Sequence, residues 1–146
     1  MLVTNHVLAG ALIGAAARGP VSAFVAGVAS HFVMDVTPHW GDEDRRTFLR
    51  VAVVDGLVGA TALTVVNRLV PATRRTRVTA GMLGAAFPDL DKPSLLFFGL
   101  SPFPDAVDTW HRQIQTESPT RLPQEFGVAA LTALAVRALV LRRGIR

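Results

Sequence analysis

A chain of 146 residues, half of them hydrophobic and with a mean hydropathy of +0.37, corresponds to one domain that is rich in apolar surface. The chain has no cysteine, which excludes disulfides, thiol catalysis and thiolate metal sites. Its formal charge of +4 comes almost entirely from arginines that lie between apolar runs, and no basic stretch is interleaved with aromatic residues. This pattern argues against nucleic acid as a partner.

Five apolar segments follow one another along the chain: 4–17, 20–36, 49–70, 78–100 and 124–141. The fourth is interrupted at 88–93, between two prolines. No stretch shows the sustained alternation that is typical of strands, so we expect an all-α protein. The segments are apolar almost all round, and 49–70 and 124–141 approach the roughly 20 residues that a helix needs to cross a bilayer. The sequence therefore predicts a small polytopic bundle of membrane helices, with residues 1–146 forming one domain.

A weak internal repeat divides the first four segments into two helical hairpins, residues 4–36 and 49–100. In each hairpin a polar residue precedes a glycine by four positions, and a second glycine precedes an aspartate by eight positions. The four pairs are His6 with Gly10, Asp55 with Gly59, Gly27 with Asp35, and Gly81 with Asp89. Glycines on one helix face let two backbones approach closely. We expect close helix crossings beneath the polar groups, and ordinary small-residue packing is the alternative.

An up-and-down threading of these segments places all four histidines, and the acids of the apolar runs, at one end of the bundle. Ionisable residues in apolar helices are costly to bury and therefore indicate function. His31 and Asp35 are four positions apart, so they share one helix face. Imidazole and carboxylate together are common ligands of divalent metals. The candidate metal ligands are His6, His31, Asp35, His39, Asp89 and Asp91.

Two further residues are candidates for catalysis, Asp55 and His111. Asp55 is the acid set deepest in an apolar run, where an ionised carboxylate needs a partner. We expect it to face the bundle interior, near a metal ligand, as a general base or an orienting group. The competing interpretation has Asp55 bonded to a backbone or hydroxyl group. His111 shares a helix face with Asp108, which predicts either an orienting pair or a solvated helix.

The opposite end of the threaded bundle carries eight arginines and no acid: Arg18, Arg68, Arg74, Arg75, Arg77, Arg142, Arg143 and Arg146. Positively charged loops favour the cytoplasmic side of a membrane. The arginine end is therefore expected in the cytoplasm, and the histidines and acids on the outward face.

Three short motifs resemble those of a known family. They are Thr-Asn-His at 4–6, Phe-Pro-Asp-Leu-Asp-Lys-Pro at 87–93, and a looser match that begins with Trp-His-Arg at 110–112. The segment from Gly27 to Trp40 adds a Ser-His pair followed by aspartate. These residues resemble the predicted membrane-bound metal-dependent hydrolases of the LexA-regulated inner-membrane type. Lys92 stands where that family has a histidine. The resemblance implies a bacterial inner-membrane protein with a divalent metal.

The function expected from these observations is hydrolysis of a phosphoester or another ester by metal-activated water. Zinc is the first choice of metal, with manganese and magnesium as alternatives. The expected partners are the lipid bilayer and an amphiphilic substrate, such as a phospholipid or an isoprenoid phosphate. Lys92 is expected either to pair with the neighbouring aspartates or to contact an anionic substrate. The alternative function is a non-enzymatic membrane protein, whose His/Asp network fixes helix packing or conducts ions or protons.

Overall fold

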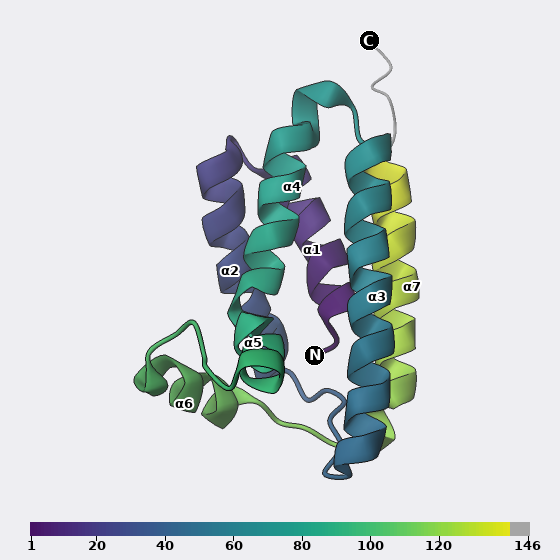
Figure 1. Cartoon of the computed structure of the whole chain (residues 1–146). Coiled ribbons are helices and arrows are strands. Elements are labelled where there is room, and N and C mark those ends of the chain that lie inside the picture. The colour runs from purple at the N-terminus through teal and green to yellow at the C-terminus, as the bar shows by residue number, and fades with distance from the viewer. Residues whose placement is uncertain (141–146) are drawn as a thin grey trace.

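The computed structural model describes residues 1–140, which form helices joined by short loops and contain no strand (Figure 1). In chain order the elements are α1 (Val3–Ala16), α2 (Pro20–Val36), α3 (Arg45–Leu69), α4 (Ala72–Ala86), η1 (Phe87–Leu90), α5 (Asp91–Phe98), α6 (Asp105–Ile114), η2 (Pro119–Arg121) and α7 (Leu122–Leu139). The all-α prediction is confirmed for these residues. Leu141, where the fifth apolar segment was expected to end, lies outside the described residues, as do Arg142, Arg143 and Arg146.

The first two helices match their predicted segments closely, the third and fourth begin earlier than expected, and the expected break in the fourth segment is confirmed. α3 begins four residues early because Asp44 caps it: the carboxylate accepts from the backbone N–H of Thr47 at 2.9 Å and from its hydroxyl at 2.7 Å. The fourth segment is divided into α4, η1 and α5. The break falls at Pro88, whose lack of an N–H favours the first positions of a helix.

α1 lies at the centre of the bundle and contacts α2, α3, α4 and α7 (Figure 1). α4 packs chiefly against α1 and α2 and only slightly against α3, its neighbour in sequence. The buried apolar cluster joins α1 to α3, α4 and α7; its members are Val7, Leu8, Ala11, Val66, Val70, Val78, Met82, Val136 and Val140. The main helix contacts of α4 are therefore with the first hairpin and not with its own.

Glycines permit the close approach of α4 to α1 and α2. A Cβ atom added at Gly14 would lie 2.5 Å from the carbonyl oxygen of Arg77, and one added at Gly27 would lie 2.5 Å from that of Gly81. Gly10 faces Gly81 at a similarly tight crossing. The close crossings expected at Gly10, Gly27 and Gly81 are confirmed. They connect the two hairpins with each other, because α4 of the second hairpin lies against α1 and α2 of the first.

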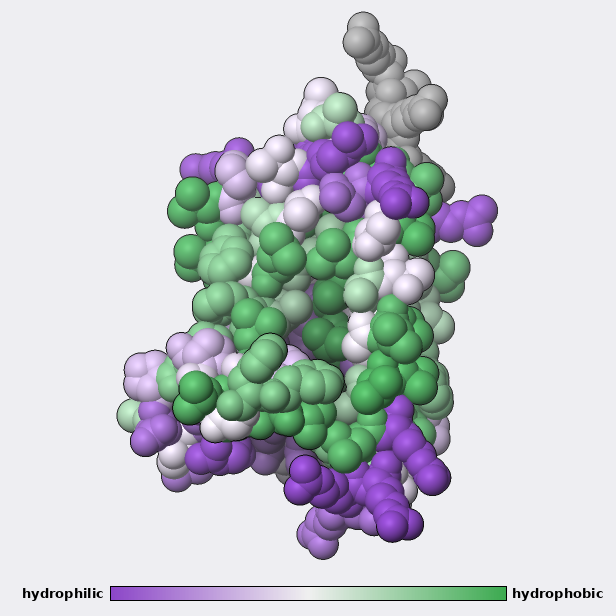
Figure 2. Space-filling view, in the orientation of Figure 1, coloured by the Kyte–Doolittle hydropathy of each residue, from purple (hydrophilic) through white to green (hydrophobic). Residues whose placement is uncertain are grey.

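One helix of residues 1–140, α3, is long and apolar enough to cross a membrane, judged by length and composition. α1 and α2 are shorter apolar helices. Figure 2 shows apolar residues covering the middle of the visible face, while hydrophilic residues gather at its two ends. The starts of α1 and α3 and the ends of α2 and α4 all lie at the end of the bundle that also carries α5 and α6 (Figure 1). The chain therefore brings its candidate site residues to one end.

Candidate metal centre

Four side chains from three parts of the chain converge beside the end of α2. His31 and Asp35 come from the last turns of α2, Asp89 from η1 and His111 from α6. Each offers a ligand atom, and these atoms all lie within 4.8 Å of one another. The i,i+4 spacing places His31 and Asp35 on one face of α2. The break after α4 turns Asp89 toward these two residues. We call these four residues the donor group.

Three atoms of the donor group form a nearly equilateral triangle. The Nε2 atoms of His31 and His111 are 3.1 Å apart, and Oδ2 of Asp35 lies 3.2 Å from the first and 3.1 Å from the second. Oδ1 of Asp89 is 3.8 Å from Nε2 of His31. Ligands about 2.0–2.1 Å from a zinc ion at tetrahedral angles are about 3.3 Å apart. The spacing of the donor group therefore fits a single ion.

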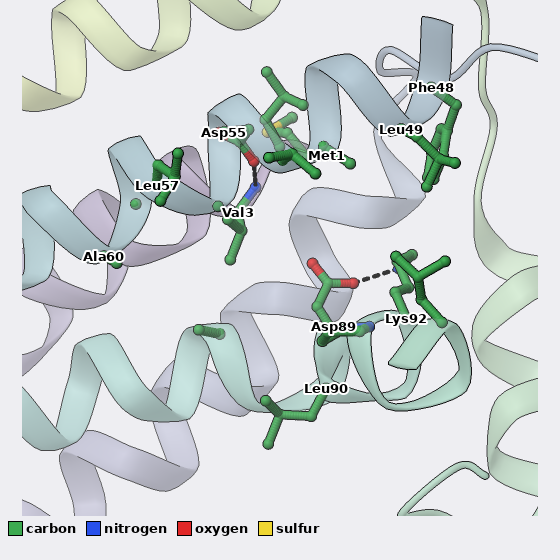
Figure 3. A pocket seen from close by; sticks show the side chains of 18 of the residues that line it. Met1, Val3, Phe48, Leu49, Asp55, Leu57, Ala60, Asp89, Leu90 and Lys92 are labelled. Carbon is green, nitrogen blue, oxygen red and sulfur yellow. Dashed lines mark hydrogen bonds and ion pairs between the residues drawn. The ribbon is translucent and has the colours of Figure 1, made fainter. Parts of the chain in front are cut away.

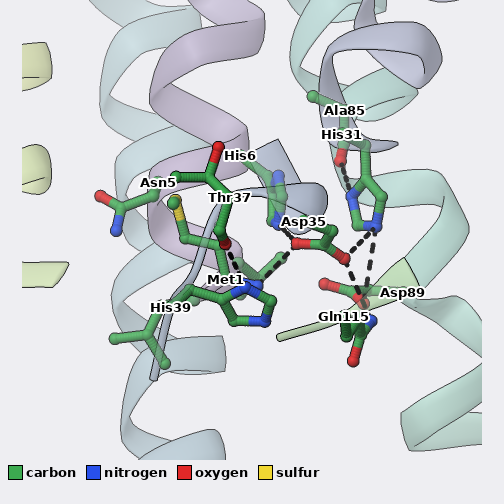
Figure 4. A network of polar contacts seen from close by, with 12 residues as sticks. Met1, Asn5, His6, His31, Asp35, Thr37, His39, Ala85, Asp89 and Gln115 are labelled. Atoms are coloured by element: carbon green, nitrogen blue, oxygen red, sulfur yellow. Dashed lines mark hydrogen bonds and ion pairs between the residues drawn. The ribbon is translucent and has the colours of Figure 1, made fainter. Parts of the chain in front are cut away.

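Groups behind the two imidazoles fix the direction in which their Nε2 atoms point. Nδ1 of His31 lies 2.8 Å from the carbonyl oxygen of Ala85, so Nδ1–H donates to it and the Nε2 lone pair faces the donor group (Figure 4). Nδ1 of His111 lies 3.7 Å from Oδ2 of Asp91. The ring of Phe32 contacts both imidazoles edge-on, at centroid distances of 5.4 and 5.5 Å. Both rings are thus held in a ligand-like orientation.

The electrostatic surroundings of His111 keep it protonated when no metal ion is present. Burial lowers the pKa of His111, but the nearby carboxylates of Asp35 and Asp91 outweigh this effect and raise the pKa to about 9. A metal ion binds the neutral imidazole, so binding at neutral pH displaces this proton.

His6 lies next to the donor group but outside it. Its ring stacks on that of His31 with centroids 4.0 Å apart, and its Nε2 is 3.1 Å from Oδ1 of Asp35, the oxygen that faces away from His111. The side chain is fully buried, yet neither ring nitrogen has a hydrogen bond of good geometry. Oδ1 of Asp35 accepts instead from the amine of Met1 at 2.6 Å. His6 therefore contacts a candidate ligand without joining the donor group.

His39 and Asp91, two other predicted ligands, also lie outside the donor group. The backbone of His39 pairs with residues 116–118, which turns the ring so that Nδ1–H donates to the carbonyl of Thr37 at 2.8 Å. Its Nε2 lies 3.7 Å from Oε1 of Glu117. Asp91 is two positions after Asp89, a spacing that turns side chains to different sides of a helical turn. It therefore lies behind His111 rather than beside His31.

Asp55 faces the interior, as predicted, but its hydrogen bonds are made to the backbone of α1 and not to a histidine. Oδ2 accepts from the N–H of Val3 at 2.6 Å, and Oδ1 accepts from the N–H of Thr4 at 3.2 Å (Figure 3). The first N–H groups of a helix have no partner within the helix. Asp55 of α3 therefore caps α1, which corresponds to the competing interpretation of this residue and replaces its assignment to catalysis.

Glu125 of α7 caps the same helix end and was not identified from the sequence. Its Oε2 accepts from the N–H of Leu2 at 3.2 Å and from Nδ2 of Asn5 at 2.6 Å, while Oε1 accepts from the N–H of Trp40 at 3.1 Å. The side chain is buried. An acid at the start of an apolar segment was the available signal. Gln115, which donates to Oδ2 of Asp35 at 3.1 Å, carried no comparable signal.

Replacing Asp55 with alanine is expected to lower the free energy of unfolding by about 0.5–2 kcal/mol, the usual effect of losing a helix cap. Metal content should be retained, because Asp55 touches the backbone of α1 and none of the donor group. Thermal unfolding and elemental analysis of the purified variant measure the two effects. A variant that keeps its stability but loses its metal would restore Asp55 to the site.

A cleft of about 860 Å³ opens between α3 and the η1–α5 segment (Figure 3). Its walls are mostly apolar, and Asp89 of the donor group and Lys92 both line it. The ammonium of Lys92 pairs with Oδ1 of Asp89, which agrees with the first of the two roles expected for this lysine. The cleft therefore connects the donor group with the outer surface of the bundle.

Comparisons with family models, curated proteins and solved structures gave no match to this chain. The resemblance to membrane-bound hydrolases therefore rests on the three motifs and the segment from Gly27 to Trp40. Of the residues that carry the resemblance, four belong to the donor group: His31, Asp35, Asp89 and His111. His6 and Asp91 contact its members.

Proposed function

We propose that the protein is a membrane-embedded, metal-dependent hydrolase of an amphiphilic ester or phosphoester. The observation that carries the proposal is the convergence of His31, Asp35, Asp89 and His111 on one ion-sized space. Two imidazoles and two carboxylates suit zinc first, with manganese and magnesium as alternatives. A bound ion of this kind activates water and polarises a carbonyl or phosphoryl oxygen.

The residues of this chain would hold and orient such an ion in distinct ways. Asp35 supplies an anionic donor between the two imidazoles, and Asp89 supplies a second one at the cleft. The carbonyl of Ala85 and the carboxylate of Asp91 lie behind the imidazoles and keep their Nε2 atoms directed inward. Phe32 covers both rings and limits the access of water from that side.

A membrane location is supported by the length and apolar character of α3 and by the apolar band between two hydrophilic ends (Figure 2). We propose that α1, α2, α4 and α7 cross the bilayer beside α3, which makes the protein polytopic. The end that carries Arg74 and Arg75 would face the cytoplasm, and the donor group would face outward. The inner membrane of a bacterium follows from the family resemblance.

A buried polar network that fixes helix packing is the second candidate function. It is favoured by the hydrogen bonds of Asp35, whose Oδ2 accepts from Gln115 at 3.1 Å and also contacts His111. Such a network satisfies the buried carboxylate without an ion. It would hold α2 against α6 and contribute no chemistry.

Elemental analysis of detergent-purified protein separates the two functions. A hydrolase of the proposed kind should contain about one equivalent of a divalent metal per chain, and reloading after chelation should raise its melting temperature. A packing network should contain no stoichiometric metal and should melt at the same temperature with or without added ions. The second result would remove the basis of the hydrolase proposal.

A further inference from the structure

α6 presents three different faces to its surroundings. Asp108 and His111 are buried against the rest of the chain. Because successive residues of a helix are rotated by about 100°, Val107, Trp110 and Ile114 share a second face. Val107 and Trp110 on this face are 40% and 46% exposed. The third face is polar and exposed: Asp105, Thr109, Arg112 and Gln113. Exposed apolar and polar faces on one short helix are typical of helices that lie in a membrane interface.

The end of α5 and the residues that follow it add further exposed apolar side chains. Phe97, Phe98 and Leu100 are 71%, 77% and 71% exposed. The position of α6 itself is fixed by α2, because the ring of Trp110 meets that of Phe32 edge-on with centroids 4.7 Å apart. The segment from α5 to α6 is therefore attached to the bundle, while a large apolar surface on it remains exposed.

This segment lies at the edge of the apolar band of the bundle. Figure 1 shows α6 running across the direction of the bundle helices, at the end where α2 and α4 finish. In Figure 2 the apolar band gives way to hydrophilic residues at this end. The polar face of α6 carries one acid, Asp105, and one base, Arg112, so it has no net charge that would select an anionic lipid. The surface suits the boundary between hydrocarbon and headgroups of a neutral phospholipid.

We propose that α6 and the end of α5 lie in the headgroup region of a phospholipid bilayer, with α6 parallel to the membrane surface. Val107 and Trp110 enter the outer part of the hydrocarbon, a depth that tryptophan favours, and Thr109 and Arg112 face water. This proposal rests on the membrane location given in the proposed function and adds a depth to it. Because His111 is on the same helix, the donor group lies at the level of the headgroups.

Tryptophan fluorescence measures the depth of each face of α6. The protein is reconstituted into phosphatidylcholine vesicles whose acyl chains carry bromine atoms either near the headgroup or near the chain end. Trp40→Phe leaves Trp110 as the sole tryptophan. Two matched proteins carry Trp40→Phe and Trp110→Phe together with one new tryptophan. Thr109→Trp places it on the polar face of α6, and Leu131→Trp places it on an exposed position near the middle of α7.

Bromine near the headgroup should quench Trp110 at least about twofold more strongly than bromine near the chain end. Thr109→Trp should be quenched little by either lipid, and Leu131→Trp most strongly by bromine near the chain end. If Leu131→Trp is quenched but Trp110 is not, or if Trp110 and Thr109→Trp are quenched equally, the proposal is overturned and the membrane location stands. A second copy of the chain covering α6 would give the first of these results. No quenching of Leu131→Trp would contradict the membrane location itself, and the proposal with it.

Discussion

Asp35→Asn is expected to reduce the metal content of the purified protein from about one equivalent per chain to near zero. Oδ2 of Asp35 lies 3.2 Å from Nε2 of His31 and 3.1 Å from Nε2 of His111, closer to the imidazoles than the 3.8 Å between Oδ1 of Asp89 and His31. Asparagine keeps the size of the side chain but removes the negative charge that offsets the charge of a divalent ion. Removing an outer partner of a ligand costs about 10–100-fold in metal affinity, and losing the ligand itself should cost more.

Elemental analysis and titration with zinc measure this effect, and Asp105→Asn is the matched control. Asp105 lies on α6, the helix that carries His111, but its side chain is exposed and outside the donor group. The control should bind metal like the parent. If both variants keep a full equivalent, the carboxylate of Asp35 serves helix packing, and the second candidate function gains the stronger support.

Gly81→Ala is expected to destabilise the fold by at least about 2 kcal/mol, the cost of forcing extra volume into a packed interior. The added Cβ atom would meet the carbonyl oxygen of Gly10 and approach both the N and Cα atoms of Gly14 to 2.9 Å. All of these are backbone atoms, so α1 and α4 would have to move apart. The same movement would shift the carbonyl of Ala85 and the side chain of Asp89, which follow on α4 and η1.

Gly127→Ala gives the control, with an effect of the opposite sign. Nothing lies near the added Cβ atom there, and replacing an exposed glycine within a helix stabilises it by about 1 kcal/mol. Thermal unfolding of both variants in the same detergent measures the difference. Similar melting temperatures for the two variants would contradict the close crossing of α1 and α4.

The sequence predicted those parts of the structure that depend on local spacing. The pairing of His31 with Asp35 follows from the period of one helix, and the break between α4 and α5 follows from the two prolines around Asp89 and Asp91. The gathering of polar residues at one end followed from alternating helix directions. Each of these features depends either on residues that are close in sequence or on the alternating direction of successive helices.

The features that the sequence did not predict depend on which helices touch. Asp55 was expected near a metal ligand because it is set deep in an apolar run, but depth does not say which face of α3 meets α1. The packing of α4 against both α1 and α2 follows from glycines on all three helices, and the sequence of one helix does not show which helix its glycines will meet. Likewise, the position of His111 depends on how α6 docks against α2 after a loop.

The capping of α1 by Asp55 and Glu125 has a consequence for the order in which the contacts of α1 form while the chain is being synthesised. α1 emerges from the ribosome long before either carboxylate, and unpaired N–H groups are costly in a bilayer. In the proposed membrane location its first turn would stay near lipid headgroups or water until α3 arrives, and Leu2 would gain its partner only when α7 is in place. His6 is one turn from these N–H groups, so its final position is also set last. A chain whose synthesis has not reached α7 would hold His6 loosely, and the surroundings of Asp35 would be completed only in the nearly finished protein.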